Sequence, residues 1–229
     1  MDSLSWADLL PELRVALVET FIMVGASLAF SVLFGLPLGF FLFLTKKGML
    51  LENRFLNLTG GLLTNFVRSL PFVILLILLI PFSLIVTGKT TGPIAAIVPL
   101  AVASVAFYAR LVESALSEVS SGVIEAARAF GSSNGLIVRK VLFPEAKAGL
   151  ARGLTVTTIS LIGFSAMAGV VGGGGIGFLA INYGYYRYET GVMVITVVLL
   201  IVLVQTIQSL GDAIAHHLDN SRSGGSSRS

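Results

Sequence analysis

Residues 20–45, TFIMVGASLAFSVLFGLPLGFFLFLT, contain no charged side chain over 26 positions. A helix of ~20 apolar residues is long enough to cross the ~30 Å hydrocarbon core of a bilayer. Four more uncharged runs reach this length, over residues 69–88, 90–109, 153–186 and 190–211. The ten-residue alternation typical of closed membrane barrels is absent. The sequence therefore predicts an all-α polytopic membrane protein with five transmembrane helices.

The composition separates this chain from soluble proteins. Its 229 residues are 55% hydrophobic and 12% charged, with a mean hydropathy of +0.93, whereas soluble domains carry about 25% charged residues. The sequence lacks cysteine, which excludes disulfides, thiolate catalysis and cysteine metal sites. The adjacent His216 and His217 are interpreted as solvated tail residues and not as metal ligands. We therefore predict no catalytic residue, no metal site and no cofactor bound by this chain.

The basic residues gather on one side of the five predicted spans. Five crossings put the termini on opposite sides of the membrane, and 12 of the 15 lysines and arginines then fall on the side of the C-terminus. These are Lys46, Lys47, Arg54, Arg68, Arg110, Arg128, Arg139, Lys140, Lys147, Arg152, Arg222 and Arg228. Because cytoplasmic loops carry the excess of basic residues, we expect the N-terminus outside and the C-terminus inside. This distribution predicts contact with membrane lipid and no nucleic-acid partner.

The chain is predicted to form one transmembrane domain over residues 1–219. The acidic stretch up to Glu19 lacks the basic start of a signal peptide, so we expect no cleavage. The Ser/Gly/Arg-rich residues 220–229 predict a disordered tail.

The 34-residue uncharged run 153–186 is too long for one helix and contains a glycine cluster. We expect a span from about Lys147 to Val171, followed by an uncharged loop or a re-entrant turn. Asn182 and Gly184 predict a further turn before the next span.

Arg68 adjoins the predicted span 69–88, in the sequence Arg68-Ser-Leu-Pro71. One interpretation is a cation that faces a translocation pathway and meets a carboxylate there. The other is an interfacial anchor at the inner end of the span, whose side chain reaches to the lipid headgroups. The sequence leaves both interpretations open.

Two nucleotide-binding patterns are incomplete. The spacing of Gly172, Gly174 and Gly177 matches a dinucleotide fingerprint, but it follows a membrane span and lacks a strand–helix–strand context. Gly88-Lys89-Thr90 resembles the end of a phosphate-binding loop, but Ser83 stands where that loop needs its first glycine. If the protein performs uphill transport, the energy therefore comes from a partner.

The longest polar segment lies within residues 113–146 and is organised as two short helices. Ser120, Ser121 and Gly122 offer N-caps for an amphipathic helix over residues 123–130, with Glu125 in its first turn. Gly131 suits the left-handed position that ends a helix.

Ser132, Ser133 and Asn134 can cap the second helix, over residues 136–142. Pro144 is expected to end that helix, because the residue before a proline is pushed out of the α region. Pro144 can also begin the fourth span, since proline is tolerated in a first turn.

This loop resembles the EAA motif of ABC-importer permeases. Glu125-Ala126-Ala127 is followed after three residues by Gly131, and after nine more by Val141, Phe143 and Pro144. Further stretches resemble the methionine-import permeases of that superfamily, over residues 66–76, 94–100, 109–113, 137–141, 165–167 and 182–186. In that family the first short helix of the loop is a coupling helix that docks on an ATP-binding subunit.

The resemblance implies an importer permease that translocates methionine, including its D-form, by alternating access in the bacterial inner membrane. It implies a second copy of this chain, two ATP-binding subunits that bind ATP and Mg, and an external methionine-binding lipoprotein. The chain itself is then not an enzyme. The implied coupling residues are Glu125, Ala126, Ala127, Arg128, Gly131 and Pro144.

Other candidate residues lie in the fourth span and the outer loop. Ser165, Met167 and Arg68 are candidates for the translocation pathway, although Met167 could instead pack in the core. Tyr183 and Tyr185 could contact the binding protein or belong to an aromatic belt. The alternatives are a permease for another small amino acid or an oxyanion, an ATPase-independent secondary transporter, and a membrane scaffold.

Overall fold

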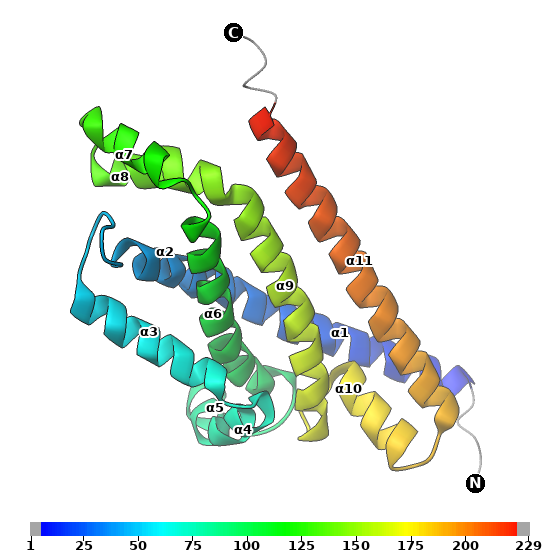
Figure 1. Ribbon diagram of the computed structural model, residues 1–229. Coiled ribbons are helices and arrows are strands. Elements are labelled where there is room, and N and C mark those ends of the chain that lie inside the picture. The colour runs from blue at the N-terminus through cyan, green and yellow to red at the C-terminus, as the bar shows by residue number, and fades with distance from the viewer. Residues whose placement is uncertain (1–5, 224–229) are drawn as a thin grey trace.

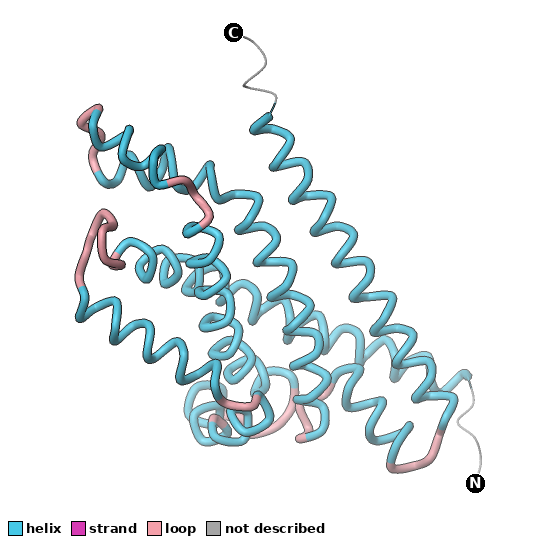
Figure 2. Tube along the Cα trace, viewed as in Figure 1, coloured by secondary structure: helices cyan, strands magenta, loops and turns pink. Residues whose placement is uncertain are grey.

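The computed structural model describes residues 6–223, and within this range the chain is helical and contains no strand. The elements are α1 (Trp6–Phe30), η1 (Ser31–Gly35), α2 (Leu36–Leu44), α3 (Arg54–Ser69), α4 (Phe72–Leu78), α5 (Ile80–Thr87), α6 (Pro93–Ser117), α7 (Ser121–Ala129), α8 (Asn134–Ile137), η2 (Val138–Leu142), α9 (Phe143–Val170), α10 (Gly175–Leu179), η3 (Ala180–Tyr185) and α11 (Thr190–Ser223). The η elements are short π-helical turns. Figure 2 shows the short connections between the helices.

Four helical segments are long and apolar enough to cross a membrane: Leu9–Leu44, Pro93–Ser117, Asn134–Val170 and Thr190–Asp219. A fifth span exists if α3 and α4, which meet at 103°, are counted as one broken span. The prediction of an all-α polytopic fold is confirmed.

The predicted single span over residues 69–88 is wrong. This stretch forms two short helices, α4 and α5, and the broken span begins earlier, at Arg54. Pro71 and Pro81 interrupt the helical hydrogen bonding because each lacks an N–H and fixes its φ angle. The long helix of this region is α3. The charged residues Arg54 and Arg68 lie near the two ends of α3. The uncharged stretch between them is shorter than a membrane span, so the pattern of uncharged runs does not indicate this helix.

Helices α6 and α9 form the centre of the molecule and pack against each other along their length (Figure 1). Helices α1 and α2 contact α6 on one side, while α11 contacts α9 on the other. One buried cluster includes Met23, Leu100 and Leu161. A second cluster, which includes Val112 and Leu142, joins α6 to the segment that holds α7 and α8.

Two ends of the bundle are distinct in Figure 1. The end of α2, the start of α3, and α7 and α8 lie at one end, while α10 and the connection before α11 lie at the other. The start of α1 and the end of α11 lie at opposite ends, as expected for five spans. Helix α11 continues to Ser223, so residues 220–223 of the predicted tail are helical, and residues 224–229 lie outside the described residues.

The expected re-entrant turn after the fourth span is present. Helix α9 ends at Val170, and the chain turns through glycines with positive φ into α10. The further turn expected at Asn182 and Gly184 is wrong, because both residues belong to the π-helical turn η3. The chain reverses instead after Tyr186, where Tyr188 adopts a φ of 58°.

Candidate functional site

Helix α7 is held to the body of the protein by one face only. Ile124 is buried among the residues that join α6 to η2. Glu125, Ala126 and Arg128 are exposed, and Ala127 is half-buried. Glu125 falls in the second turn and not the first, because α7 begins at Ser121. The face opposite Ile124 is therefore open to a partner.

Phe130 is the largest apolar side chain on this open surface, with 89% of its area exposed. Val123 and Leu136 are also exposed, at 43% and 48%. Contiguous exposed apolar side chains rimmed by charges are typical of interaction sites. The sequence indicates Phe130 only as the end of a helix, because periodicity gives no measure of exposure.

Gly131 ends α7 in the left-handed conformation that the sequence predicts, with a φ of 79°. The amide of Gly131 donates to the carbonyl of Arg128 at 2.9 Å, and the amide of Ser132 donates to the carbonyl of Ala127 at 3.1 Å. These two bonds form a Schellman motif, which satisfies carbonyls that the helix end leaves free. The motif fixes the backbone on both sides of Phe130 and therefore the position of this residue at the end of α7.

The second short helix begins at Asn134, two residues earlier than predicted. Its predicted cap is confirmed, because the side chain of Ser133 accepts a hydrogen bond from the amide of Leu136. Its predicted end at Pro144 is wrong. Phe143 keeps helical angles of −64° and −48°, and the helix runs on through η2 into α9. A π-helical turn just before Pro144 widens the backbone, which accommodates a residue without an N–H. The alternative, with Pro144 in the first turn of the fourth span, is confirmed.

The loop is therefore rigidly joined to a spanning helix. A displacement of α7 acts on α8, η2 and α9, which form one continuous helical segment over Asn134–Val170. Asn134 also donates its side-chain amide to the carbonyl of Leu50 at 3.2 Å, which ties α8 to the turn between α2 and α3. The arrangement can transmit a movement of the exposed helix α7 to the spanning helix α9.

The pathway candidates in α9 point in different directions. Ser165 is 2% exposed and donates its hydroxyl to the carbonyl of Ile162 at 2.8 Å, so it is committed to its own helix. Met167 is 45% exposed on the surface of the bundle. Of these two residues, only Met167 faces outward from the described chain.

Arg68 does not lie at the inner end of a span. It is in the last turn of α3, the turn farthest from the end that carries α7 (Figure 1). Its guanidinium carbon is 5.9 Å from the centre of the Phe107 ring on α6. The interpretation as a headgroup anchor at that inner end therefore fails on position.

The two tyrosines of η3 differ. Tyr183 is half-buried and packs under the guanidinium of Arg187, whose carbon lies 4.3 Å from the ring centre. Tyr185 is 62% exposed and meets Tyr186 edge to face, with the ring centres 5.3 Å apart. Tyr185 is thus available to a partner, while Tyr183 belongs to the packing of the loop.

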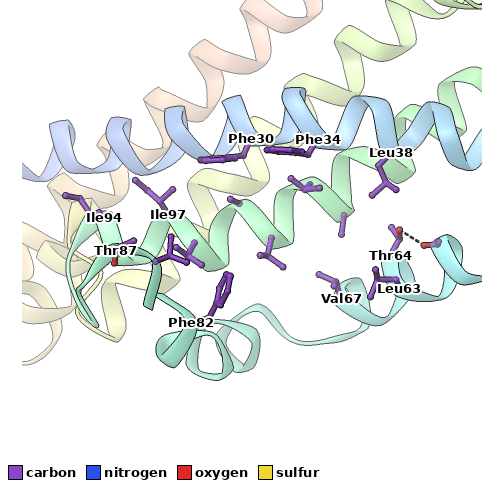
Figure 3. Close-up of a pocket in the computed structure, with 17 residues that line it drawn as sticks. Phe30, Phe34, Leu38, Leu63, Thr64, Val67, Phe82, Thr87, Ile94 and Ile97 are labelled. Atoms are coloured by element: carbon purple, nitrogen blue, oxygen red, sulfur yellow. Dashed lines mark hydrogen bonds between the residues drawn. The ribbon is translucent and has the colours of Figure 1, made fainter. Parts of the chain in front are cut away.

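A large apolar cavity has a volume of about 640 Å³. It lies between α1, α3, α5 and α6, with Phe30, Phe34 and Phe82 on its walls (Figure 3). The hydroxyl of Thr64 is already bonded to the carbonyl of Gly60 at 2.8 Å. None of the described residues that line it is charged. A zwitterion would find no ionic partner there.

Comparison with known proteins is consistent with this geometry. The family model of the binding-protein-dependent transport system inner membrane component matches residues 31–222. A probable D-methionine transport system permease protein of Vibrio cholerae is 47% identical over 208 residues, covering 91% of this chain and 92% of its own. The methionine import system permease protein of Bacillus subtilis is 45% identical over 178 residues, covering 78% and 80%.

Solved structures of ABC transporters have the same fold as this chain. A chain from inward-facing MetNI methionine ABC transporter crystals superposes with a TM-score of 0.91 at 43% identity, covering 94% of this chain and 99% of that one. An amino acid ABC transporter with histidines shares the fold at 22% identity and a TM-score of 0.77. The chain therefore belongs to the family of binding-protein-dependent transport system inner membrane components.

Proposed function

We propose that this chain is the permease subunit of an ABC importer that carries methionine, including D-methionine, into the cytoplasm. As a family member it is a multi-pass inner-membrane component of a transport system and not an enzyme. Methionine is the substrate that the names of its relatives give, and those relatives cover most of the chain. ATP and Mg bind to a separate ATPase subunit in this proposal.

The exposed surface of α7 carries the proposal. Phe130 stands 89% exposed at the end of a helix that is fixed by the Schellman motif at Gly131. The small Ala126 leaves the helix backbone accessible for close docking, and Glu125 and Arg128 supply charges at the rim. We assign Glu125, Ala126, Ala127, Arg128, Gly131 and Pro144 to coupling, and we add Phe130.

The continuous segment from α8 to α9 gives the coupling a physical route. ATP binding closes two ATPase subunits, the two α7 helices approach each other, and α9 of each copy moves with them. A pathway between two copies then opens outward, and hydrolysis resets it. Met167 lies on the open surface of α9, in keeping with a position along this pathway, whereas Ser165 supports the helix from within.

The opposite end of the molecule is proposed to receive an external methionine-binding lipoprotein. Tyr185, 62% exposed in the loop before α11, is the stronger of the two tyrosine candidates for this contact. Tyr183 instead packs against the guanidinium of Arg187, which lies over its ring.

Uptake of labelled methionine tests the proposal. The gene is supplied, together with the ATPase and binding-protein genes of its source, to cells that lack their own importer. Glu125→Lys is expected to lower uptake at least tenfold while insertion into the membrane is unchanged. Glu118→Lys, which changes an exposed glutamate outside α7, serves as the matched control and should transport normally.

The outcomes separate the parts of the proposal. Wild-type uptake that requires the ATPase supports the importer. An ATPase that co-purifies with a chain that does not transport methionine refutes the substrate and keeps the family assignment. Methionine uptake that continues without the ATPase refutes the coupling and favours a secondary transporter.

A further inference from the structure

Arg68 lies beside the middle part of helix α6. Its guanidinium stacks near Phe107, which is the fifteenth of the 25 residues of α6. At 1.5 Å per residue, Phe107 is roughly 15 Å from the end of α6 at Ser117 and roughly 21 Å from the end at Pro93. The guanidinium of Arg68 therefore lies beside the inner part of α6 and away from both of its ends.

The charge of Arg68 has no ionic partner in the part of the chain that the structure describes. The ion pairs that Glu113 and Asp219 form with Lys46, Arg110 and Arg152 do not involve Arg68. The ring of Phe107 is its aromatic neighbour, at a distance typical of a cation–π contact. A charged side chain inside a bilayer is costly, and those that occur face the interior of a bundle or a water-filled cavity. Arg68 is exposed at the surface of the single chain, as a residue of a pathway between two copies would be.

A small cavity of about 230 Å³ opens beside this guanidinium. Its walls include the rings of Phe72, Phe107 and Phe164, which come from α4, α6 and α9. The rings of Phe72 and Phe164 stack with their centres 4.5 Å apart, so this wall is preformed. Drug-sized ligands occupy cavities of roughly 300–1,000 Å³, which makes this one suitable for a single small metabolite.

The chemistry of the walls selects the ligand. An arginine fork binds a carboxylate through two parallel hydrogen bonds. Aromatic rings attract a thioether sulfur, and an unbranched chain adapts to irregular apolar walls. Helix α3 ends at Ser69, and the amide of Leu70 donates to the carbonyl of Val67 at 3.4 Å. The carbonyls that follow Val67 in the last turn have no helical donor, because the helix stops there. Such carbonyls can accept from an ammonium group.

We propose that Arg68 and the surrounding phenylalanines form a transit site for a zwitterionic α-amino acid with a thioether or other unbranched apolar side chain. Arg68 holds the carboxylate, and Phe72, Phe107 and Phe164 contact the side chain. This inference deepens the proposed import function and rests on it. The larger 640 Å³ cavity is unsuited to the same ligand, because the described residues that line it include no charge.

Photolabelling tests the site directly. The complex of this chain with its ATPase subunit, in lipid nanodiscs, is irradiated with photo-methionine, an L-methionine analogue in which a diazirine replaces the thioether. Labelled residues are mapped by mass spectrometry. We expect labels within residues 66–76, 103–107 or 161–167, competition by L-methionine, and at least tenfold weaker competition by methioninamide, which lacks the carboxylate.

Variants add a second readout. Arg68→Gln is expected to lower the labelling about tenfold, and Arg68→Lys to retain part of it, since a lysine keeps the charge but loses the fork. Lys89→Gln, which removes a basic residue outside the cavity, is the matched control and should label like the wild type. If Arg68→Gln does not assemble, the positions labelled in the wild-type complex and the weaker competition by methioninamide still test the transit site.

Three results overturn the inference: labels outside these segments, equal competition by methioninamide, or an assembled Arg68→Gln complex that labels fully. Its failure is distinct from failure of the import function. A wild-type complex that imports methionine but is labelled elsewhere refutes the transit site alone. A wild-type complex that does not import methionine refutes the function on which the site rests.

Discussion

The ammonium of Lys46 lies 3.0 Å from a carboxylate oxygen of Glu113, and this ion pair joins the turn after α2 to α6. The other oxygen of Glu113 accepts from Arg110. Arg110 also donates to the carbonyl of Gly61 at 3.0 Å and to the side chain of Asn65 at 2.8 Å, both on α3. One buried carboxylate therefore links three helical segments at the end of the bundle that carries α7.

Glu113→Gln is expected to destabilise this end of the protein. The substitution keeps the shape of the side chain but removes the charge that satisfies Lys46 and Arg110, and hydrogen bonds to charged groups contribute about 1.5–3 kcal/mol. Thermal unfolding of the purified complex should occur several degrees lower. Glu118→Gln, one turn further along and exposed, should leave the midpoint unchanged. Equal midpoints for both variants would remove Glu113 from any structural role.

Gly131→Val is expected to reduce the yield of the complex with the ATPase. A side chain at a φ of 79° costs roughly 1–2 kcal/mol or more, and a β-branched one is the least tolerated. A Cβ added at Gly131 or at Gly135 would meet no atom within 4 Å, so steric overlap does not distinguish the two positions. Because Gly135 has an ordinary negative φ, Gly135→Val is the control. A normal yield for Gly131→Val would show that the Schellman motif is dispensable.

Gly177→Ala is expected to disturb the packing of α10 against α9. A Cβ at Gly177 would overlap the backbone of Ala166, which cannot move aside as a flexible side chain can. Overpacking costs typically 1–3 kcal/mol, measurable as a lower midpoint of thermal unfolding. Gly163→Ala, on the same helix as Ala166 but with open space around it, should be neutral. Similar midpoints would mean that α10 does not approach α9 this closely.

Glu19→Ala is expected to loosen the re-entrant segment. The carboxylate of Glu19 accepts from the amide of Gly175 at 2.7 Å, and the hydroxyl of Thr20 accepts from the amide of Ile176 at 3.0 Å. These side chains of α1 satisfy the first amides of α10, a capping role whose loss costs about 0.5–2 kcal/mol. Hydrogen exchange of residues 175–185 should accelerate in Glu19→Ala and remain unchanged in Glu12→Ala. Unchanged exchange in both would contradict the capping role.

The sequence predicts the loop around α7 well because its signals are local. The helix over residues 123–130, the left-handed Gly131 and the cap at Ser133 depend on neighbours within a few residues. The wrong prediction that the second helix ends at Pro144 also comes from local reasoning. It considers only the residue before the proline, whereas the π-helical turn η2 lets the helix continue past Pro144.

The depth of each charge is not a local property. The uncharged run 90–109 predicts that a span ends at Arg110, yet α6 continues to Ser117. Arg110 and Glu113 pair with each other on α6, and contacts with Lys46 and with α3 compensate them further. The assumption that a charged residue marks the end of a span also puts Arg68 at a membrane surface. Only the packing of α3 against α6 brings Arg68 beside Phe107. The exposure of Phe130 likewise depends on what the fold leaves uncovered.

Site-specific photo-cross-linking tests most directly that α7 is the docking site for the ATPase. This chain has no cysteine, so Phe130→Cys gives the purified chain one attachment point for a benzophenone maleimide, which is attached before the ATPase is added. Tyr188→Cys, 82% exposed at the opposite end, is the control. We expect a cross-link from position 130 to the ATPase subunit and none from position 188. An ATPase that co-purifies but is not cross-linked from position 130 would contradict it.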